Sequence, residues 1–282
     1  MKKKYLKVTG SLQDYKTWLE TEEAGTPSVA YLTGDDEVVY SVDYPVLPKN
    51  KIIGTLVDGT SSFSFKLNGT TVNATVFEED GKTKFSYEEA TVVTSLDDAF
   101  SGNTALVSID LWTIPFDQTA TTVRTFKGCS NLTTLFFFPG QTSTGNSCFS
   151  NCTSLSGQLV IPNTVTTIGS FVFSACGGLT SAVNVPEGST DLSASTFQNC
   201  SGLTSITLPT TTTKMAPNYL KGCTSLTSIT VKAVTPPDAS TASSSMFLDT
   251  NNCPIYVPSA SVNTYKAASG WSDFSSRIQA IQ

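Results

Sequence analysis

The sequence predicts a mainly β protein: a solenoid of stacked coils preceded by a small β-rich N-terminal domain. Three observations indicate this. One short phrase recurs every 23 to 26 residues, apolar residues alternate after each copy, and turn-separated alternating segments precede the first copy. Hydrophobic residues make up 39% of the 282 residues and charged residues 14%, which is too apolar for disorder and suits β-structure with hydroxyl-bearing faces.

The recurring phrase is Phe, then Cys three residues later, then Leu three residues after the Cys. One copy has Leu in the Phe slot, and the earliest copy has Asn in the Cys slot. The copies are Phe100–Leu106, Phe126–Leu132, Phe149–Leu155, Phe173–Leu179, Phe197–Leu203 and Leu220–Leu226. Because one such coil cannot bury its apolar side alone, we expect about six coils to stack around one core. The sequence thus predicts a leucine-rich-repeat solenoid, a right-handed coil with a parallel sheet, over residues 92–254.

A strand is predicted after each Leu of the phrase. In the coil that begins at Leu203, Ile206 and Leu208 alternate inward while Ser205 and Thr207 face outward. Stacked strands of this kind form a parallel sheet along one wall. A second apolar set is predicted to line the opposite wall: Val165, Ile168 and Phe173.

These repeats closely resemble the BspA-like leucine-rich-repeat family of bacterial surface proteins. The resemblance covers about residues 92–282, and residues 255–282 look like that family's C-terminal closing unit. Trp271 is expected to be buried in this unit rather than exposed as a carbohydrate platform. Family members are described as adhesins and as matrix- or receptor-binding proteins, so the resemblance implies interaction rather than chemistry.

Residues 1–91 do not match the repeat. A Ser-x-x-Asp box before helically spaced apolar residues favours a short helix over 11–19. A β-meander is expected from about 51 to 88, with a type I′ turn at Asn68-Gly69 and a second turn at Asp80-Gly81. We expect this domain to cap the first coil, since an open solenoid end exposes apolar surface and strand edges.

Charge and residue usage narrow the function classes. The net charge is −6 and the sequence pI about 4.7, which disfavours nucleic acid as a partner. The chain has no His, which removes the usual general base and the commonest metal ligand, so we expect no enzyme, no cofactor and no metal. The basic start leads into no apolar segment of a signal peptide, and no stretch approaches the length of a membrane span.

The cysteines occur once per coil and are predicted to form a structural ladder of buried free thiols. The ladder residues are Cys129, Cys152, Cys176, Cys200 and Cys223. The rival hypothesis is a metal site or disulfides, which an odd total of seven Cys and the missing His disfavour. The placement of Cys148 and Cys253, outside the ladder, is left open.

Acidic clusters are predicted to lie at solvated turns and strand ends. They are Asp35–Glu37, Glu78–Asp80, Glu88–Glu89 and Asp97–Asp98. A carboxylate-based hydrolase would need two of them facing each other across a substrate, and a calcium loop would need a different spacing. We treat a hydrolase as the least favoured function.

An excess of apolar residues marks one coil, between Leu132 and Pro139. Counting back from Pro139 turns Phe136 and Phe138 inward and leaves Leu135 and Phe137 outward. A register shifted by one residue swaps the two pairs and still leaves two bulky residues outward. The candidate partner-binding residues on this outward row are Trp112, Leu135, Phe137 and Val160. The alternative is that the N-terminal domain covers the patch. Phe137→Ser is then expected either to weaken partner binding or to lower the melting temperature.

The function expected from the sequence is a non-catalytic cell-surface or secreted interaction protein. It would bind a protein or glycan through the solenoid as a monomer, and its targeting segment would be absent from this chain. The alternative location is the cytoplasm. The alternative is a structural scaffold component of an envelope or particle assembly, with the N-terminal domain as the attachment module.

Overall fold

A computed structural model describes residues 51–88, 91–111, 114–135, 137–138, 140–157, 159–242 and 245–282. The helix predicted over 11–19 and the acidic cluster at 35–37 lie outside the described residues, as do Trp112 and Phe136. The described chain is mainly β, as predicted. No described helix is long and apolar enough to cross a membrane.

The N-terminal part forms an antiparallel sheet of five strands in the order β2-β3-β4-β1-β6. The strands are β1 (Lys51–Leu56), β2 (Phe63–Leu67), β3 (Thr70–Glu79), β4 (Lys82–Glu88) and β6 (Leu106–Asp110). Asn68 and Gly69 both have positive φ, 48° and 78°, as a type I′ turn requires. The meander predicted from 51 to 88 is therefore confirmed, with both of its turns at the predicted dipeptides.

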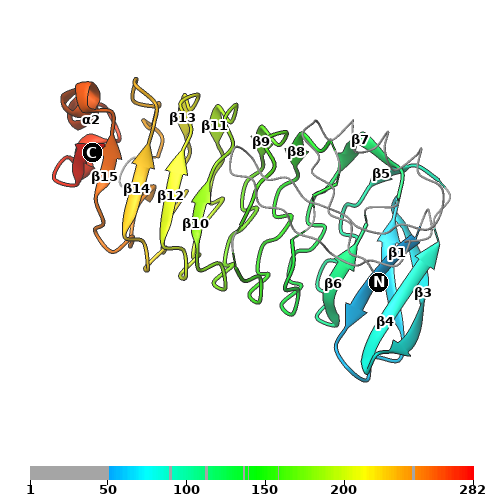
Figure 1. The fold of residues 1–282 in the computed structure, drawn as a ribbon. Helices are drawn as coiled ribbons and strands as arrows, with labels where there is room; N and C mark the ends of the chain where they lie inside the picture. Colours follow the sequence, from blue (N-terminus) through cyan, green and yellow to red (C-terminus); the bar gives the residue numbers. More distant parts are fainter. Residues whose placement is uncertain are drawn as a thin grey trace, which may run out of the picture.

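This sheet is attached to both walls of the first coil. β1 pairs antiparallel with β6, which follows the first Phe-Asn-Leu phrase. At the other edge, the backbone N–H groups of Lys66 and Asn68 donate to the carbonyls of Ala99 and Ser95, at 3.0 and 3.1 Å. The meander thus caps the coil, and one sheet crosses the boundary predicted at residue 91 (Figure 1).

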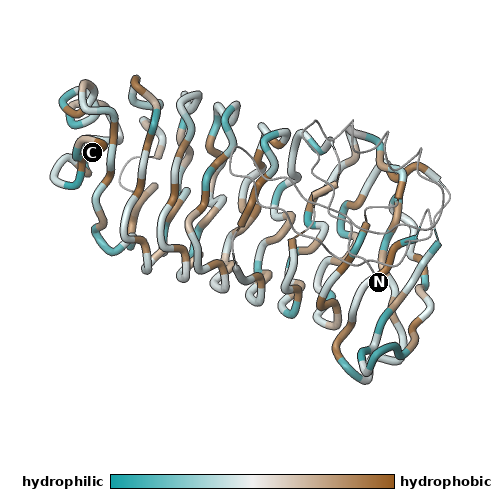
Figure 2. Tube along the Cα trace, in the orientation of Figure 1, coloured by the Kyte–Doolittle hydropathy of each residue, from teal (hydrophilic) through white to brown (hydrophobic). Residues whose placement is uncertain are grey.

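Beyond the cap, successive coils stack along one axis (Figure 1). Five strands form a parallel sheet on one wall: β10 (Ala182–Asn184), β12 (Ser205–Leu208), β14 (Ser228–Val231), β15 (Ile255–Val257) and β16 (Ile278–Ala280). Short parallel pairs mark the opposite wall: β5 (Val93–Ser95) with β7 (Phe116–Thr121), β8 (Ser143–Thr144) with β9 (Thr167–Ile168), and β11 (Asp191–Leu192) with β13 (Lys214–Met215). Apolar segments recur at corresponding places in successive coils (Figure 2).

The core between the walls is built from columns of identical side chains. The Phe rings of the phrase stack almost parallel, with centroids 5.2–5.6 Å apart from Phe100 through Phe126, Phe149 and Phe173 to Phe197. On the sheet wall, Val183, Ile206, Ile229, Ile255 and Ile278 are paired in register and buried. Each coil therefore completes the core of the next, as the repeat predicts.

The C-terminal unit continues the sheet with β15 and β16. The chain segment between these two strands covers the last coil. It contains the 3₁₀ helices η2 (Ser259–Ser261) and η3 (Ser272–Phe274) and the helix α2 (Val262–Ala267). Trp271 and Tyr265 are fully buried here. The indole Nε1 of Trp271 donates to the carbonyl of Pro237 at 2.8 Å, and the Tyr265 hydroxyl donates to the carbonyl of Ala233 at 2.7 Å. The expectation that Trp271 is buried is confirmed.

Candidate binding face

The outward side of the parallel sheet carries one row of polar side chains, which we call the sheet-face row. Strand register places its members side by side: Asn184, Thr207, Thr230, Tyr256 and Gln279. Asn184 and Gln279 are exposed, and the other three are half-buried. Neighbouring strands lie about 4.8 Å apart, so the row presents one polar group at each step across five strands.

Several other hydroxyls of the solenoid donate to its own backbone. Thr133 Oγ1 donates to the carbonyl of Val107 at 3.1 Å, Thr227 Oγ1 to that of Thr204 at 2.9 Å, and Ser181 Oγ to that of Gly157 at 3.0 Å. Within the described chain, by contrast, the polar side chains of the sheet-face row make no hydrogen bond. Their donors and acceptors are available to a ligand.

A shallow hollow lies at the C-terminal end of this row. Its volume is about 250 Å³, and it is lined by Thr230, Tyr256, Ile281 and Gln282. It brings together an aromatic ring, an aliphatic side chain, a hydroxyl and an amide. None of these side chains carries a charge.

Charged groups lie beside the sheet-face row and largely satisfy one another. Lys232 follows β14, and its Nζ lies 3.7 Å from Glu187 Oε1. Glu187 Oε2 also accepts hydrogen bonds from the backbone N–H and the hydroxyl of Thr210, at 3.0 and 2.8 Å. The row itself is therefore an uncharged strip with a paired charge at its border.

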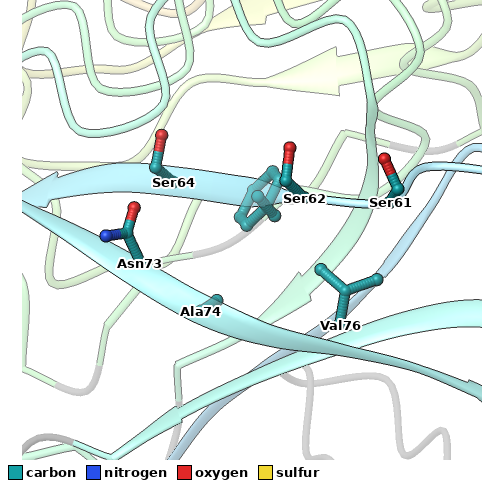
Figure 3. A pocket seen from close by; sticks show the side chains of 7 residues that line it. Ser61, Ser62, Ser64, Asn73, Ala74 and Val76 are labelled. Atoms are coloured by element: carbon teal, nitrogen blue, oxygen red, sulfur yellow. The ribbon is translucent and has the colours of Figure 1, made fainter.

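A second hollow, of about 270 Å³, lies between β2 and β3 in the N-terminal sheet. Figure 3 shows Ser61, Ser62 and Ser64 directing their hydroxyls to the same side, with Asn73, Ala74 and Val76 opposite. β3 pairs with β2 only through Ala74, and its following residues pair with β4 instead. The two strands diverge at this point and open the hollow, whose lining also includes the buried Phe63.

The predicted outward orientation of Phe137 is wrong. Its side chain is only 9% exposed and lies against Phe149, with ring centroids 5.9 Å apart. Phe138 is buried as expected and stacks on Phe116 at 4.8 Å. Two consecutive Phe side chains can both enter the core because residues 133–135 and 137–138 form no strand, so strict alternation does not apply.

The other members of the predicted apolar patch are placed differently from one another. Leu135 is half-buried against the core, whereas Val160 is 48% exposed. Trp112 lies outside the described residues. Among the described members of the patch, Val160 is thus the exposed one.

The predicted Cys ladder is buried, and its thiols form hydrogen bonds between neighbouring coils. Each Sγ donates to the carbonyl of the residue in the Phe slot of the preceding coil, at 3.0–3.1 Å, from Cys129 to Phe100 through to Cys223 to Phe197. Burial raises the pKa of the thiols of Cys129 and Cys176 to about 12. Cys148 and Cys253 are buried free thiols as well. Among the described residues, no group of three or more Cys, Asp or Glu could hold a metal ion.

The described acidic residues interact locally rather than facing one another. Glu79 pairs with Lys84 at 2.6 Å, and Glu78 accepts from the Thr83 hydroxyl. Asp98 receives Nε and Nη2 of Arg124, both at 2.7 Å, and the hydrogen bond from that guanidinium lowers the pKa of the Asp98 carboxyl. These contacts stabilise turns and neighbouring coils.

The sheet-face row was not among the residues predicted to bind a partner. Tyr256 carried the available signal: it occupies the outward position that holds Thr207 and Thr230 in the preceding coils. The prediction assigned residues 255–257 to a closing unit, so this departure from the hydroxyl pattern was overlooked.

Comparison with known structures finds several bacterial leucine-rich-repeat proteins. A leucine-rich-repeat protein of T. pallidum is 26% identical with a TM-score of 0.42, over 49% of this chain and 64% of that one. This chain thus spans less than two thirds of the T. pallidum protein. A leucine-rich cell surface protein of Faecalibacterium prausnitzii is 16% identical with a TM-score of 0.36, over 73% of this chain and 71% of that one. A leucine-rich-repeat protein of Bacteroides ovatus is 15% identical with a TM-score of 0.23, over 80% of this chain and 99% of that one.

A search of curated proteins finds no match. The model of the BspA-type leucine-rich-repeat region, in six copies, matches residues 59–157 and 142–268, which is well over half of the chain. The match begins within the N-terminal sheet, earlier than the start predicted at residue 92. The chain therefore belongs to the BspA-type leucine-rich-repeat family.

Proposed function

We propose that this chain is a non-catalytic interaction protein, secreted or held at the bacterial cell surface, that binds a protein or glycan through the outward face of its parallel sheet. Membership of the BspA-type family supports the interaction role. One observation carries the choice of face: strand register aligns five polar side chains in a single row, and none of them makes a hydrogen bond in the described chain.

The core and the strand pairing behind the sheet-face row also favour binding. The row is backed by a continuous core and by in-register backbone pairing, so its side chains project from a rigid surface. A partner that binds a rigid surface avoids the entropic cost of ordering it. The described carboxylates, by contrast, lie in ion pairs and turns, and we assign them no catalytic role.

The test is binding of the purified chain to a panel of immobilised matrix proteins and glycans at low and high salt. Thr207→Arg places a long charged side chain in the middle of the sheet-face row, and we expect it to abolish binding to any panel member that the native chain retains. Thr224→Arg is the matched control, because Thr224 is an exposed residue of the turn after Cys223, away from the row. Binding that survives Thr207→Arg would reject this face, and no binding at all would favour a scaffold role instead.

A further inference from the structure

We propose that the sheet-face row binds a linear neutral polysaccharide, with Tyr256 stacking on a sugar ring in the hollow beside Thr230. This inference rests on the proposed function and specifies its ligand. It joins three independent features: the uncharged chemistry of the row, its spacing, and the aromatic residue in the hollow.

The chemistry of the row matches that of a neutral sugar. Asn184 and Gln279 each offer amide donors and a carbonyl acceptor, and Thr207 and Thr230 each offer a hydroxyl that both donates and accepts. A sugar presents hydroxyls of the same mixed character. Carboxylate, sulfate or phosphate groups on a ligand would call for Arg or Lys, and the row contains neither.

The spacing of the row favours a linear chain lying across the strands. The five members are separated by single strand spacings, so the row extends for about 20 Å along the solenoid axis. A polymer placed along this line meets a polar side chain at each step. A monosaccharide would meet only one or two of them.

Tyr256 gives this line an anchor. It projects from β15 between Thr230 of β14 and Gln279 of β16, and it is half-buried, so part of its side chain stays accessible. The hollow of about 250 Å³ beside it is bordered by the apolar Ile281 and the amide of Gln282. An aromatic face next to hydrogen-bonding groups suits the C–H face and hydroxyl rim of a sugar ring.

A protein partner fits this surface less well. Protein interfaces concentrate binding energy in Trp, Tyr and Arg anchors at an apolar, desolvated centre. Among the outward residues of the described strands β10 to β16, Tyr256 is the single member of that set, and its neighbours in the row are hydroxyls and amides. A surface so polar would leave many buried donors and acceptors unpaired against an apolar protein patch.

The experiment is isothermal titration of the full chain with cellohexaose, xylohexaose and mannohexaose, with glucose, xylose and mannose, and with heparin as an anionic control. We expect saturable binding of at least one hexasaccharide, with the matching monosaccharide markedly weaker. Changing the salt from low to high concentration should leave the affinity unaltered, because no ion pair is formed. Tyr256→Ala should weaken binding about tenfold, the loss expected for one aromatic contact.

The controls separate stacking from folding. Tyr256→Trp should retain binding, and Thr224→Ala should leave it unchanged, while circular dichroism checks that each variant is folded. If Tyr256→Ala fails to fold, Thr207→Arg and Tyr256→Trp still test the row.

Three outcomes would overturn the inference: no neutral hexasaccharide binds, binding is indifferent to both Tyr256 and Thr207, or only heparin binds and is released by salt. If no sugar binds, but a matrix protein binds and Thr207→Arg abolishes that binding, the glycan inference is overturned and the proposed binding face is upheld. If neither sugars nor matrix proteins bind, both the glycan inference and the proposed function are rejected.

Discussion

The two ends of the solenoid close the same core in different ways. At the N-terminal end, the Phe stack simply continues: Phe65 lies over Phe100 with ring centroids 4.9 Å apart and an interplanar angle of 26°. Phe63 and Phe85 extend the aromatic cluster, and β1 and β2 bond to opposite walls of the coil. This cap prolongs contacts that the coils already make with one another.

At the C-terminal end, the stack is replaced. Phe247, Tyr265 and Phe274 meet Trp271 or one another edge to face, at centroid distances of 4.8–5.8 Å. Trp271 and Tyr265 also donate hydrogen bonds to carbonyls of the preceding coil. The N-terminal cap therefore spreads its stabilisation over many backbone pairs, whereas the C-terminal unit concentrates it in a few aromatic side chains.

Alkaline pH should unfold the coils between the two ends, and we expect this loss of stability to be the largest of the predicted effects. Burial raises the pKa of the thiols of Cys129, Cys148 and Cys176 to about 12, from about 9 in the unfolded chain. The folded state thus holds these protons more tightly, so their stabilisation is complete below pH 9 and declines as the pH rises towards 12. Circular dichroism against pH should show unfolding in this range.

Lys and Tyr side chains titrate in the same range, so a variant is needed as control. Cys176→Ala removes one of the titrating thiols, and its stability, once normalised at pH 7, should fall less steeply above pH 9. Identical slopes in the two proteins would contradict the assignment of the alkaline transition to the thiols.

Trp271→Ala tests whether a few aromatic side chains carry the stability of the C-terminal unit. It removes a fully buried ring, its hydrogen bond to Pro237 and its contacts with Phe247 and Tyr265. We expect a loss of about 3–5 kcal/mol in the free energy of unfolding, measured by urea denaturation. Hydrogen exchange should show that the lost protection is confined to the last coils, because each coil contacts only its neighbours.

Phe65→Ala is the matched variant at the other end. Its contacts are shared with Phe63, Phe85 and the strand pairing, so it should cost less than Trp271→Ala. A larger loss for Phe65→Ala than for Trp271→Ala would reverse the comparison between the ends.

Cys176→Ala probes the coils between the ends at neutral pH. The carbonyl of Phe149 accepts from the Cys176 thiol at 3.1 Å and from the Cys152 backbone N–H at 3.2 Å, so the variant removes one of two donors. We expect a loss of about 1–2 kcal/mol in urea denaturation. Cys176→Ser keeps a donor at the same place and should lose less, unless the hydroxyl fails to reach the carbonyl.

Ala175→Gly should give the smallest effect, and a stabilising one. Ala175 has a φ of 60°, while the corresponding residues of neighbouring coils are Asn151, Asn199 and the glycines Gly128 and Gly222. Relief of the left-handed strain should raise the free energy of unfolding by roughly 0.5 kcal/mol. Ala182→Gly, on a strand, is the control and should lower it by roughly 0.5–1 kcal/mol.

The sequence predicted the interior of the molecule much better than its exterior. Interior positions are held by the same contacts in every coil, so the Phe and Cys columns could be predicted from spacing alone. The error at Phe137 arose because counting back from Pro139 assumes a strand. Residues 133–135 and 137–138 form none, so Phe137 and Phe138 both enter the core.

The exterior has no such repetition. Whether a hydroxyl is free or bonded depends on the coil beside it: Thr227 donates to the carbonyl of Thr204, but Thr230, three residues on, makes no hydrogen bond in the described chain. The antiparallel pairing of β1 with β6 likewise joins a strand of the first repeat to a strand of the N-terminal meander. Neither contact leaves a pattern in the sequence that spacing could detect.

The link from each Cys thiol to the carbonyl of the preceding coil joins residues 26–29 positions apart and reaches no further. A gene segment encoding one coil can therefore be duplicated or lost without disturbing any thiol link except those at the junction. Each such event would lengthen or shorten the sheet-face row by one side chain while both caps stay intact. The length of the sheet-face row is thus open to selection in discrete steps, independently of the fold that supports it.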